Sequence, residues 1–172
     1  GDVRKTAYER ANVSTIANFD MYQSQNIVTH TVGPLGGTPL VNGGTQAVTY
    51  ANAVGTNWSQ SLITDGWTAA AAARLNAGDV FTIANVFAVN PQTRLSTGSL
   101  QQFVVTAAQT GASNALANMA ISPPMYTASN ALATIDAFPA DNAAVTFVGT
   151  ASTVYPQNLV YHKNAITLAT AD

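Results

Sequence analysis

The sequence has no cysteine, which excludes disulfide bonds and thiolate metal sites but does not fix a cellular compartment. Charge is also scarce: charged residues make up 8% of the 172 residues, against roughly 25% in an ordinary soluble domain. The six Lys and Arg residues are scattered and the net charge is −2, so no nucleic-acid-binding face is visible. No apolar run is long enough to span a membrane.

The first residues, Gly1 to Arg4, contain neither a methionine nor the apolar segment of a signal peptide. We therefore expect the chain to be a processed or excised piece of a longer protein. Its length suits about one domain with its own core.

Uncharged polar residues must cover the surface, because 47% of the residues are hydrophobic and few are charged. Such a surface repels copies of itself only weakly and tolerates dense packing against them. A secreted or adhesin-like module has a similar composition. The composition alone therefore supports self-association and adhesion equally.

The most informative stretch runs from Gly78 to Ala107. It begins with two segments rich in β-branched and aromatic residues, Val80–Ile83 and Val86–Val89, which favour strands. Asn90-Pro91 then interrupts pairing because proline has no N–H. A polar tip follows, and a strand resumes at Leu100. The pattern predicts a long antiparallel hairpin whose core residues are Val80, Ile83, Val86, Phe87, Phe103 and Val105.

Short strands separated by Gly, Pro, Asn and Asp turns occupy most of the remaining sequence. The expected strands are Thr38–Val41, Gln46–Ala51, Trp58–Ile63 (ending at an Asp65-Gly66 turn), Ala115–Ser122, Val145–Val148, Leu159–His162 and Ala165–Ala169. Two short helices are expected at Asp2–Val13 and at Thr68–Leu75, the second because alanine is the best helix former. The expected fold class is mainly β: a small antiparallel β-barrel with one or two short helices and flanking strands.

Catalytic chemistry finds little support. The two histidines, His30 and His162, stand alone in strand patterns, and the aspartates are single and mostly at turns, where they hydrogen-bond the local backbone. No Gly-x-Ser-x-Gly motif is present, and the glycine-rich stretch Gly33–Gly44 lacks the features of a phosphate loop. Trp58 and Trp67 can stack on a sugar, although core packing is the more common use of tryptophan. We expect no catalytic residue, no metal site and no cofactor.

Three segments together resemble a known family. They are LNAGDVFTIANVFAVNPQTRLSTGSLQQFVVTA, AISPPMY and YPQNLVYHKNAITLATAD. The chain is similar to the major capsid (coat) protein of tailed double-stranded-DNA bacteriophages, in the short-tailed-phage branch that carries a β-barrel insertion domain. The Gly78-Asp79-Val80 opening, the Ile121-Ser122-Pro123 strand end and the final strand pair match that branch.

The resemblance implies a structural protein and a division of the chain into three parts. These are an outgoing segment of the capsid core domain (1–35), the insertion domain (36–152) and re-entry strands (153–172). The family's spine helix, N-arm and E-loop have no counterpart, which implies a fragment of the subunit. Ile16–Val32 and Leu159–Ala169 are then expected to lie side by side.

The implied partners are other copies of the coat protein in an icosahedral shell, with scaffolding and portal proteins during assembly. No specific nucleic-acid site and no membrane are expected, and the implied location is the virion, assembled in the bacterial host cytoplasm. A protruding loop bridges capsomers in relatives, and the corresponding residues here are uncharged: Ala51, Asn52, Ala53, Val54, Gly55, Thr56 and Asn57.

Two rival hypotheses stay open. One is a carbohydrate-binding or adhesin-type β-domain that uses the two tryptophans. The other, weaker one is a hydrolase that uses a histidine.

Overall fold

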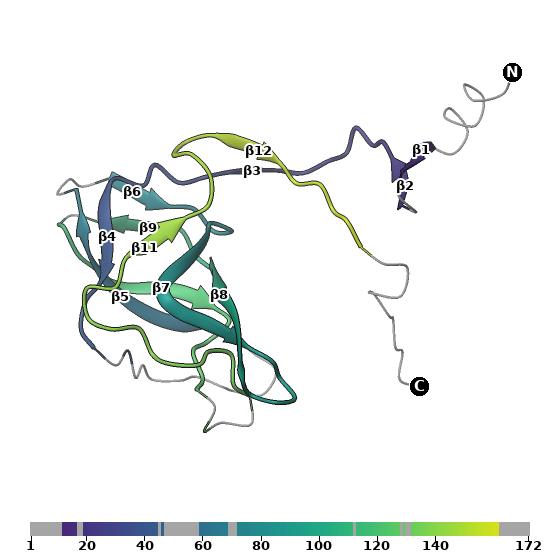
Figure 1. Cartoon of the computed structure of the whole chain (residues 1–172). Helices are drawn as coiled ribbons and strands as arrows, with labels where there is room; N and C mark the ends of the chain where they lie inside the picture. Colours follow the sequence, from purple (N-terminus) through teal and green to yellow (C-terminus); the bar gives the residue numbers. More distant parts are fainter. Residues whose placement is uncertain are drawn as a thin grey trace, which may run out of the picture. The chain divides into compact units, whose positions relative to one another are not determined.

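The computed structural model describes residues 12–16, 19–44, 46, 59–68, 72–111, 113–127, 129 and 132–161. Within these residues the regular elements are strands (Figure 1). None of the described segments forms a helix long and apolar enough to cross a membrane. The chain divides into two compact units, one formed by Thr31–Val154 and the other by Gly1–His30 with Tyr155–Asp172.

The larger unit is built on a six-stranded sheet in which every neighbouring pair is antiparallel. Its two outer strands approach each other, because Leu40 forms a bridge with Ala144 and the Val41 N–H donates to the Ala143 carbonyl at 2.9 Å. The sheet therefore curves into a nearly closed barrel. In spatial order its strands are β11 (Val145–Phe147), β7 (Val80–Val89), β8 (Ser96–Val105), β10 (Leu116–Ser122), β5 (Gln60–Trp67) and β4 (Gly37–Val41).

Three further strand pairs complete the described structure. In the larger unit, β6 (Ala72–Leu75) pairs with β9 (Gln109–Gly111), and in the smaller one β1 (Asn12–Ile16) pairs with β2 (Phe19–Tyr22). The third pair joins β3 (Thr29–Thr31) to β12 (Val154–Pro156), and the boundary between the units falls inside it.

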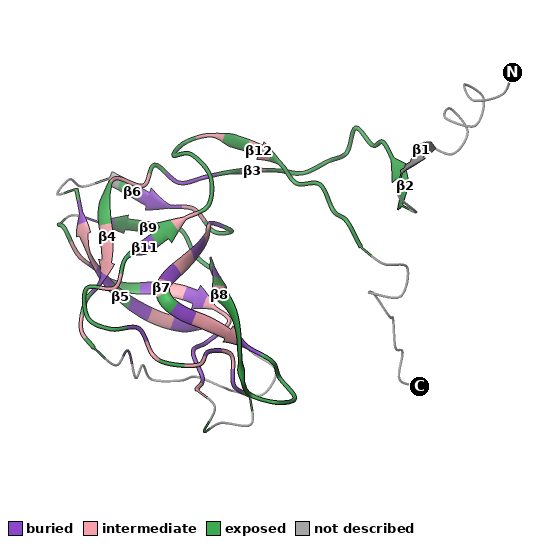
Figure 2. Cartoon of the chain, in the orientation of Figure 1, coloured by how far each residue is buried: buried purple, intermediate pink, exposed green. Residues whose placement is uncertain are grey.

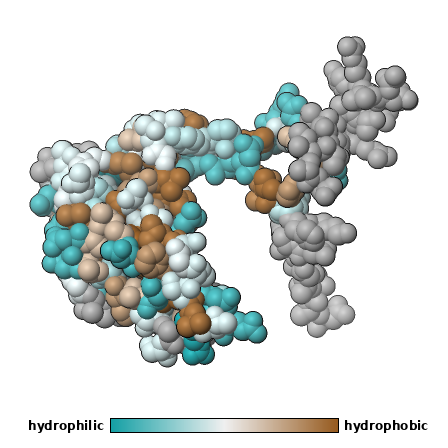
Figure 3. Space-filling model, viewed as in Figure 1, coloured by the Kyte–Doolittle hydropathy of each residue, from teal (hydrophilic) through white to brown (hydrophobic). Residues whose placement is uncertain are grey.

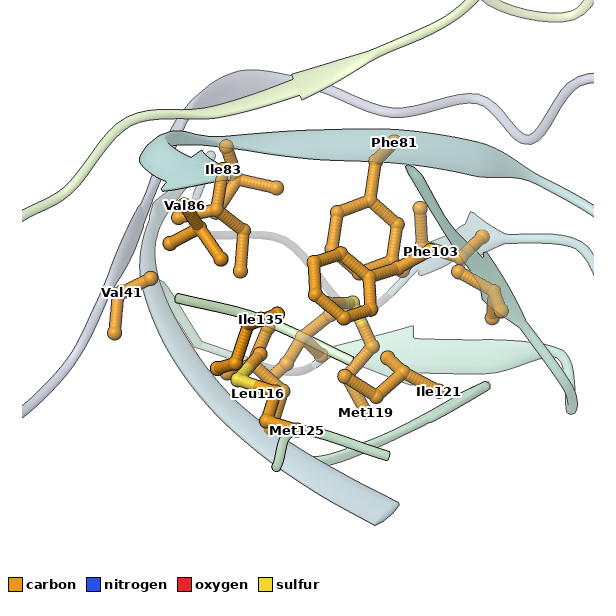
Figure 4. Packing of buried hydrophobic residues seen from close by; sticks show 14 of the residues in the cluster. Val41, Phe81, Ile83, Val86, Phe103, Leu116, Met119, Ile121, Met125 and Ile135 are labelled. Carbon is orange, nitrogen blue, oxygen red and sulfur yellow. The ribbon is translucent and has the colours of Figure 1, made fainter. Parts of the chain in front are cut away.

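The barrel interior holds one cluster of buried apolar side chains contributed by all six strands and by the segment after β10 (Figure 4). Phe81 and Phe103 are fully buried and stack with ring centroids 5.5 Å apart. Ile83, Val86 and Val105 are also fully buried. The predicted hairpin and most of its core are therefore confirmed.

Two of the predicted core residues are wrong. Val80 and Phe87 are only half-buried, while Phe81 takes the inward position. Phe81 lies opposite Phe103, so both side chains point to the same face of the sheet. Asn85, with a φ of 61°, sits where the β7–β8 register shifts. An irregularity of this kind moves the inward position by one residue, from Phe87 to Val86.

The helix predicted at Thr68–Leu75 is also wrong over its described part, where Ala72–Leu75 is strand β6. Arg74 and Leu75 are both buried, and β6 pairs with β9. Tertiary pairing thus overrides the helix propensity of the alanines.

The expected turn at Asp65-Gly66 is a continuation of β5, which runs on to Trp67. Gly66 has a φ of 74°, and a side chain there would collide with the Thr38 carbonyl of β4. The glycine therefore permits a close approach of two strands rather than a chain reversal.

At the two ends, the observed neighbours differ from the expected ones. Thr29–Thr31 pairs with Val154–Pro156, earlier in the chain than expected, and Leu159–Tyr161 is in no strand. Asn12 and Val13 begin strand β1 instead of ending a helix. The remaining predicted elements fall outside the described residues: the rest of the first helix, residues 47–51 and residues 162–169.

Candidate functional site

Three of the four aspartates in the barrel unit accept hydrogen bonds from backbone N–H groups. Asp136 accepts from the Phe87 N–H at 2.9 Å, and Asp141 accepts from the Gly43 N–H at 2.8 Å. These carboxylates bond the backbone, as expected, and the local partner is present for Asp136, which also accepts from the Ala137 N–H at 2.8 Å. The distant partners in sequence were not predicted. Within the described residues, no three His, Asp or Glu side chains gather where they could hold a metal ion.

Asp79 forms the most elaborate of these contacts. Its side chain is 1% exposed and accepts hydrogen bonds from the Gly33 N–H at 3.1 and 3.2 Å and from the Asn76 N–H at 2.8 Å. The Asn76 side chain in turn donates to the Thr31 carbonyl at 2.9 Å. A buried carboxylate is tolerated only when such donors replace its water. Asp79 therefore anchors the segment that enters the barrel to the turn between β6 and β7.

Gly33 fits this anchor because it has no side chain. A Cβ atom there would lie 2.5 Å from the Arg74 carbonyl oxygen, 2.7 Å from the Leu75 Cα and 2.8 Å from an Asp79 carboxylate oxygen. The buried Arg74 side chain donates to the Thr68 carbonyl, and its own carbonyl accepts from the Leu35 N–H at 2.9 Å. Asp79 and Arg74, two of the few charged residues, thus both stabilise the contact between the entering segment at Gly33 and strand β6.

The anchor explains the motif Gly78-Asp79-Val80. Gly78 adopts a φ of 99° and donates to the Val105 carbonyl at 2.7 Å. The Val105 N–H returns a bond to the Asp79 carbonyl at 2.8 Å. The motif starts β7 by pairing it with the end of β8 while the aspartate side chain binds the entering chain. Its Asp79–Gly33 contact spans 46 residues, so sequence spacing gives no signal for it.

The residues of the rival hypotheses are not assembled into a site. Trp67 is 2% exposed, donates from its indole N–H to the Thr64 hydroxyl at 2.9 Å and packs against the Phe147 ring. It is therefore a core residue and unavailable for stacking on a sugar. His30 is half-buried in β3. Trp58 and His162, like the predicted intersubunit loop Ala51–Asn57, lie outside the described residues.

The hairpin between β7 and β8 is the most exposed part of the barrel unit, with residues 90–100 all exposed (Figure 2). Its turn is ordered by internal hydrogen bonds. The Asn90 side chain accepts from the Gln92 and Thr93 N–H groups at 2.9 and 3.2 Å, and the Arg94 N–H donates to the Asn90 carbonyl at 2.7 Å. Leu95, beside Arg94, is 69% exposed. The tip of the hairpin is thus exposed to solvent and held in one conformation by its internal hydrogen bonds.

Apolar side chains also reach the surface elsewhere, as the brown patches among pale and teal atoms in Figure 3 show. Among residues 19–30 and 155–161, the part of the smaller unit for which burial is described, no hydrophobic residue is buried. Its exposed apolar residues include Phe19, Tyr22, Val28, Leu159 and Val160. The described core therefore belongs entirely to the barrel.

Comparison with known proteins gives one family. No curated protein matches the chain, whereas the family model described as "P22 coat protein - gene protein 5" matches residues 1–172. The barrel, the Gly-Asp anchor and the sparse charge agree with the resemblance seen in the sequence. Because the match covers the whole sequence, the chain belongs to the P22 coat protein family, the structural coat proteins of short-tailed bacteriophages.

Proposed function

We propose that the barrel is the insertion domain of the coat subunit and that it supports both subunit folding and shell stability. Coat-protein membership makes the chain part of a structural protein that assembles with its own copies into a virion capsid. The proposed domains are an outgoing segment (1–35), the insertion domain (36–152) and re-entry strands (153–172). The proposal further assigns assembly to the host cytoplasm, with scaffolding and portal proteins as transient partners and no enzymatic activity.

The pairing of β3 with β12 is the observation that carries the insertion-domain proposal. An inserted domain must leave and return at nearly the same place, so that the host domain can close around it. Hydrogen bonds extend this pairing on both sides, from Gln157 N–H to Val28 carbonyl at 3.0 Å and from Val32 N–H to Thr153 carbonyl at 3.0 Å.

The distribution of buried residues supports a role in folding. The described buried apolar side chains lie between Val32 and Val145, inside the larger unit. A barrel with its own core can fold first and hold its two ends together. The host domain then avoids the entropy cost of closing a loop of more than 100 residues, which grows slowly with loop length but has a substantial constant part.

Sparse charge suits the proposed shell contacts. Each contact between copies can be individually weak, because it is repeated many times in a closed shell. Uncharged polar surfaces allow such contacts without strong repulsion between identical subunits.

The test compares residues 31–154 produced alone with residues 1–172. We expect the isolated barrel to unfold cooperatively in urea at nearly the same midpoint as in the longer chain. In the complete coat protein, the Phe103→Ala exchange should then lower the yield of soluble subunits and of icosahedral particles seen by electron microscopy. An isolated barrel that is unfolded without denaturant would refute the folding role.

A further inference from the structure

The barrel does not close completely, and a groove remains between its two outer strands. Residues 35–40, before and within β4, form one wall, and residues 144–147, at β11, form the other. The groove has a volume of about 370 Å³. A cavity of roughly 150 Å³ already accepts a benzene ring, so this groove has room for a large apolar side chain.

Pro39 keeps the groove open. Leu40 and Ala144 form the last antiparallel bridge between the two strands. Continuing that register by one residue would place Pro39 opposite Val145. Proline has no N–H, so it cannot donate the next hydrogen bond of the ladder. The barrel therefore stops closing at this residue.

On the other wall, backbone groups of β11 face the groove. The Ala144 carbonyl accepts a hydrogen bond from β7 at 2.9 Å, and the Val148 N–H donates one to β7 at 2.8 Å. Positions that bond to a given neighbour alternate along an antiparallel strand. The N–H and C=O groups of Val145 and Phe147 therefore point away from β7, toward the groove.

The groove is lined mostly by apolar residues, and two aspartates lie near one end of it. No charged residue lines it. Asp65 lies opposite Leu40 in the β4–β5 register, and the exposed Asp141 accepts from the Gly43 N–H where the two outer strands meet. A fitting partner therefore has an apolar side chain beside a cation.

The tip of the β7–β8 hairpin has this composition. Leu95 is 69% exposed, and the neighbouring Arg94 is the one exposed Lys or Arg among the described residues of the barrel unit. The tip cannot reach the groove of its own barrel. Ile83 lies opposite Val145, and the seven residue steps from Ile83 to Asn90, the residue after the end of β7, span roughly 20 Å.

We propose that the groove of one coat subunit receives the hairpin tip of a second copy. Leu95 enters between β4 and β11, and Arg94 faces the carboxylates of Asp65 and Asp141. The contact is heterologous, because tip and groove are different surfaces of the same chain. It rests on the proposed role in a self-assembling shell, where many copies make a weak contact effective.

Cysteine cross-linking tests the contact directly, because residues 1–172 contain no cysteine and any cysteine elsewhere in the complete coat protein is first replaced by serine. Complete coat protein carrying Leu95→Cys is co-assembled with coat protein carrying Thr146→Cys, and the particles are oxidised. We expect a dimer containing a disulfide between positions 95 and 146, identified by mass spectrometry of its peptides. Such a bond requires Cα atoms within about 7 Å.

The matched control carries Leu132→Cys instead of Leu95→Cys, at a residue that is also well exposed (48%). Together with Thr146→Cys it should give at least tenfold less cross-link. Adding Arg94→Glu to the Leu95→Cys protein should lower the cross-linking rate severalfold, because a like charge then faces the two aspartates. Intact particles without the 95–146 bond, or with bonds between two tips, would overturn the groove contact and leave the proposed function standing. Failure of the unmodified protein to form shells would instead refute both.

Discussion

Replacing Gly33 by alanine perturbs the anchor at Asp79 by a single methyl group. The added Cβ would lie 2.5 Å from the Arg74 carbonyl oxygen and 2.7 Å from the Leu75 Cα. Both are backbone atoms of a paired strand, so rotation of a side chain cannot relieve the clash. The entering segment must move away by about 1 Å to reach ordinary contact distance.

That displacement breaks the hydrogen bonds that the segment makes. The Gly33 N–H lies 3.1 and 3.2 Å from the two Asp79 carboxylate oxygens, and the Leu35 N–H lies 2.9 Å from the Arg74 carbonyl. A hydrogen bond to a charged group contributes about 1.5–3 kcal/mol and a neutral one about 1 kcal/mol. We therefore expect Gly33→Ala to lower the free energy of unfolding by about 3–4 kcal/mol, a large part of the roughly 5–15 kcal/mol typical of a domain.

Urea unfolding followed by tryptophan fluorescence measures this loss, with Gly44→Ala as the matched control. At Gly44 the nearest atom that an added Cβ would meet is 4.0 Å away, so the control should stay within about 0.5 kcal/mol of the unchanged chain. A loss below about 1 kcal/mol for Gly33→Ala, with an unchanged denaturant slope, would show that the segment can shift without cost and that the anchor does not hold it.

Three further exchanges test other parts of the structure. Asp79→Asn keeps the size of the side chain but turns an amide donor toward backbone N–H groups; it should cost about 2–3 kcal/mol in the same melts, and an unchanged midpoint would contradict the anchor. Phe103→Ala should cost about 3–5 kcal/mol because the ring is fully buried, whereas Phe87→Ala, at a half-buried position, should cost less than half as much; equal losses would contradict the inward shift at Asn85. Pro39→Val supplies the missing donor, whose acceptor is the Val145 carbonyl, so the new amide N–H at position 39 should exchange severalfold more slowly than the new amide N–H that Pro91→Val places in the exposed hairpin; equal exchange rates would contradict the role of Pro39.

The fold class followed from local features of the sequence. Alternating β-branched and aromatic residues in β7 and β8 predict a hairpin, because such residues suit a pleated surface with one buried face. The strands at Thr38–Val41, Ala115–Ser122 and Val145–Val148 were found within a residue of their predicted bounds. These elements have boundaries set by Pro, Gly and Asn residues that act locally.

The errors arose where a distant contact outweighs a local preference. The alanines before Arg74 favour a helix, but pairing with β9 makes them a strand. The inward face of β7 changes at Asn85, whose positive φ has no unambiguous signal in the sequence. The Asp79–Gly33 contact and the groove at Pro39 depend on strand neighbours that only the folded chain defines. The loop Ala51–Asn57 stays a prediction, because it lies outside the described residues.

The pairing of β3 with β12 has a mechanical consequence. The chain enters the barrel through β3 and leaves it through β12. These two strands are antiparallel neighbours, and the residues at the outer end of their pairing, Val28 and Gln157, are hydrogen-bonded to each other. A force that pulls these ends apart acts across the ladder and breaks its bonds one at a time, beginning with the 3.0 Å bond between Gln157 and Val28. The bond between Val32 and Thr153 carries load only after that. Tension on the chain segments before β3 and after β12 thus first separates this short ladder. Only afterwards does the tension act on the six strands around Phe81.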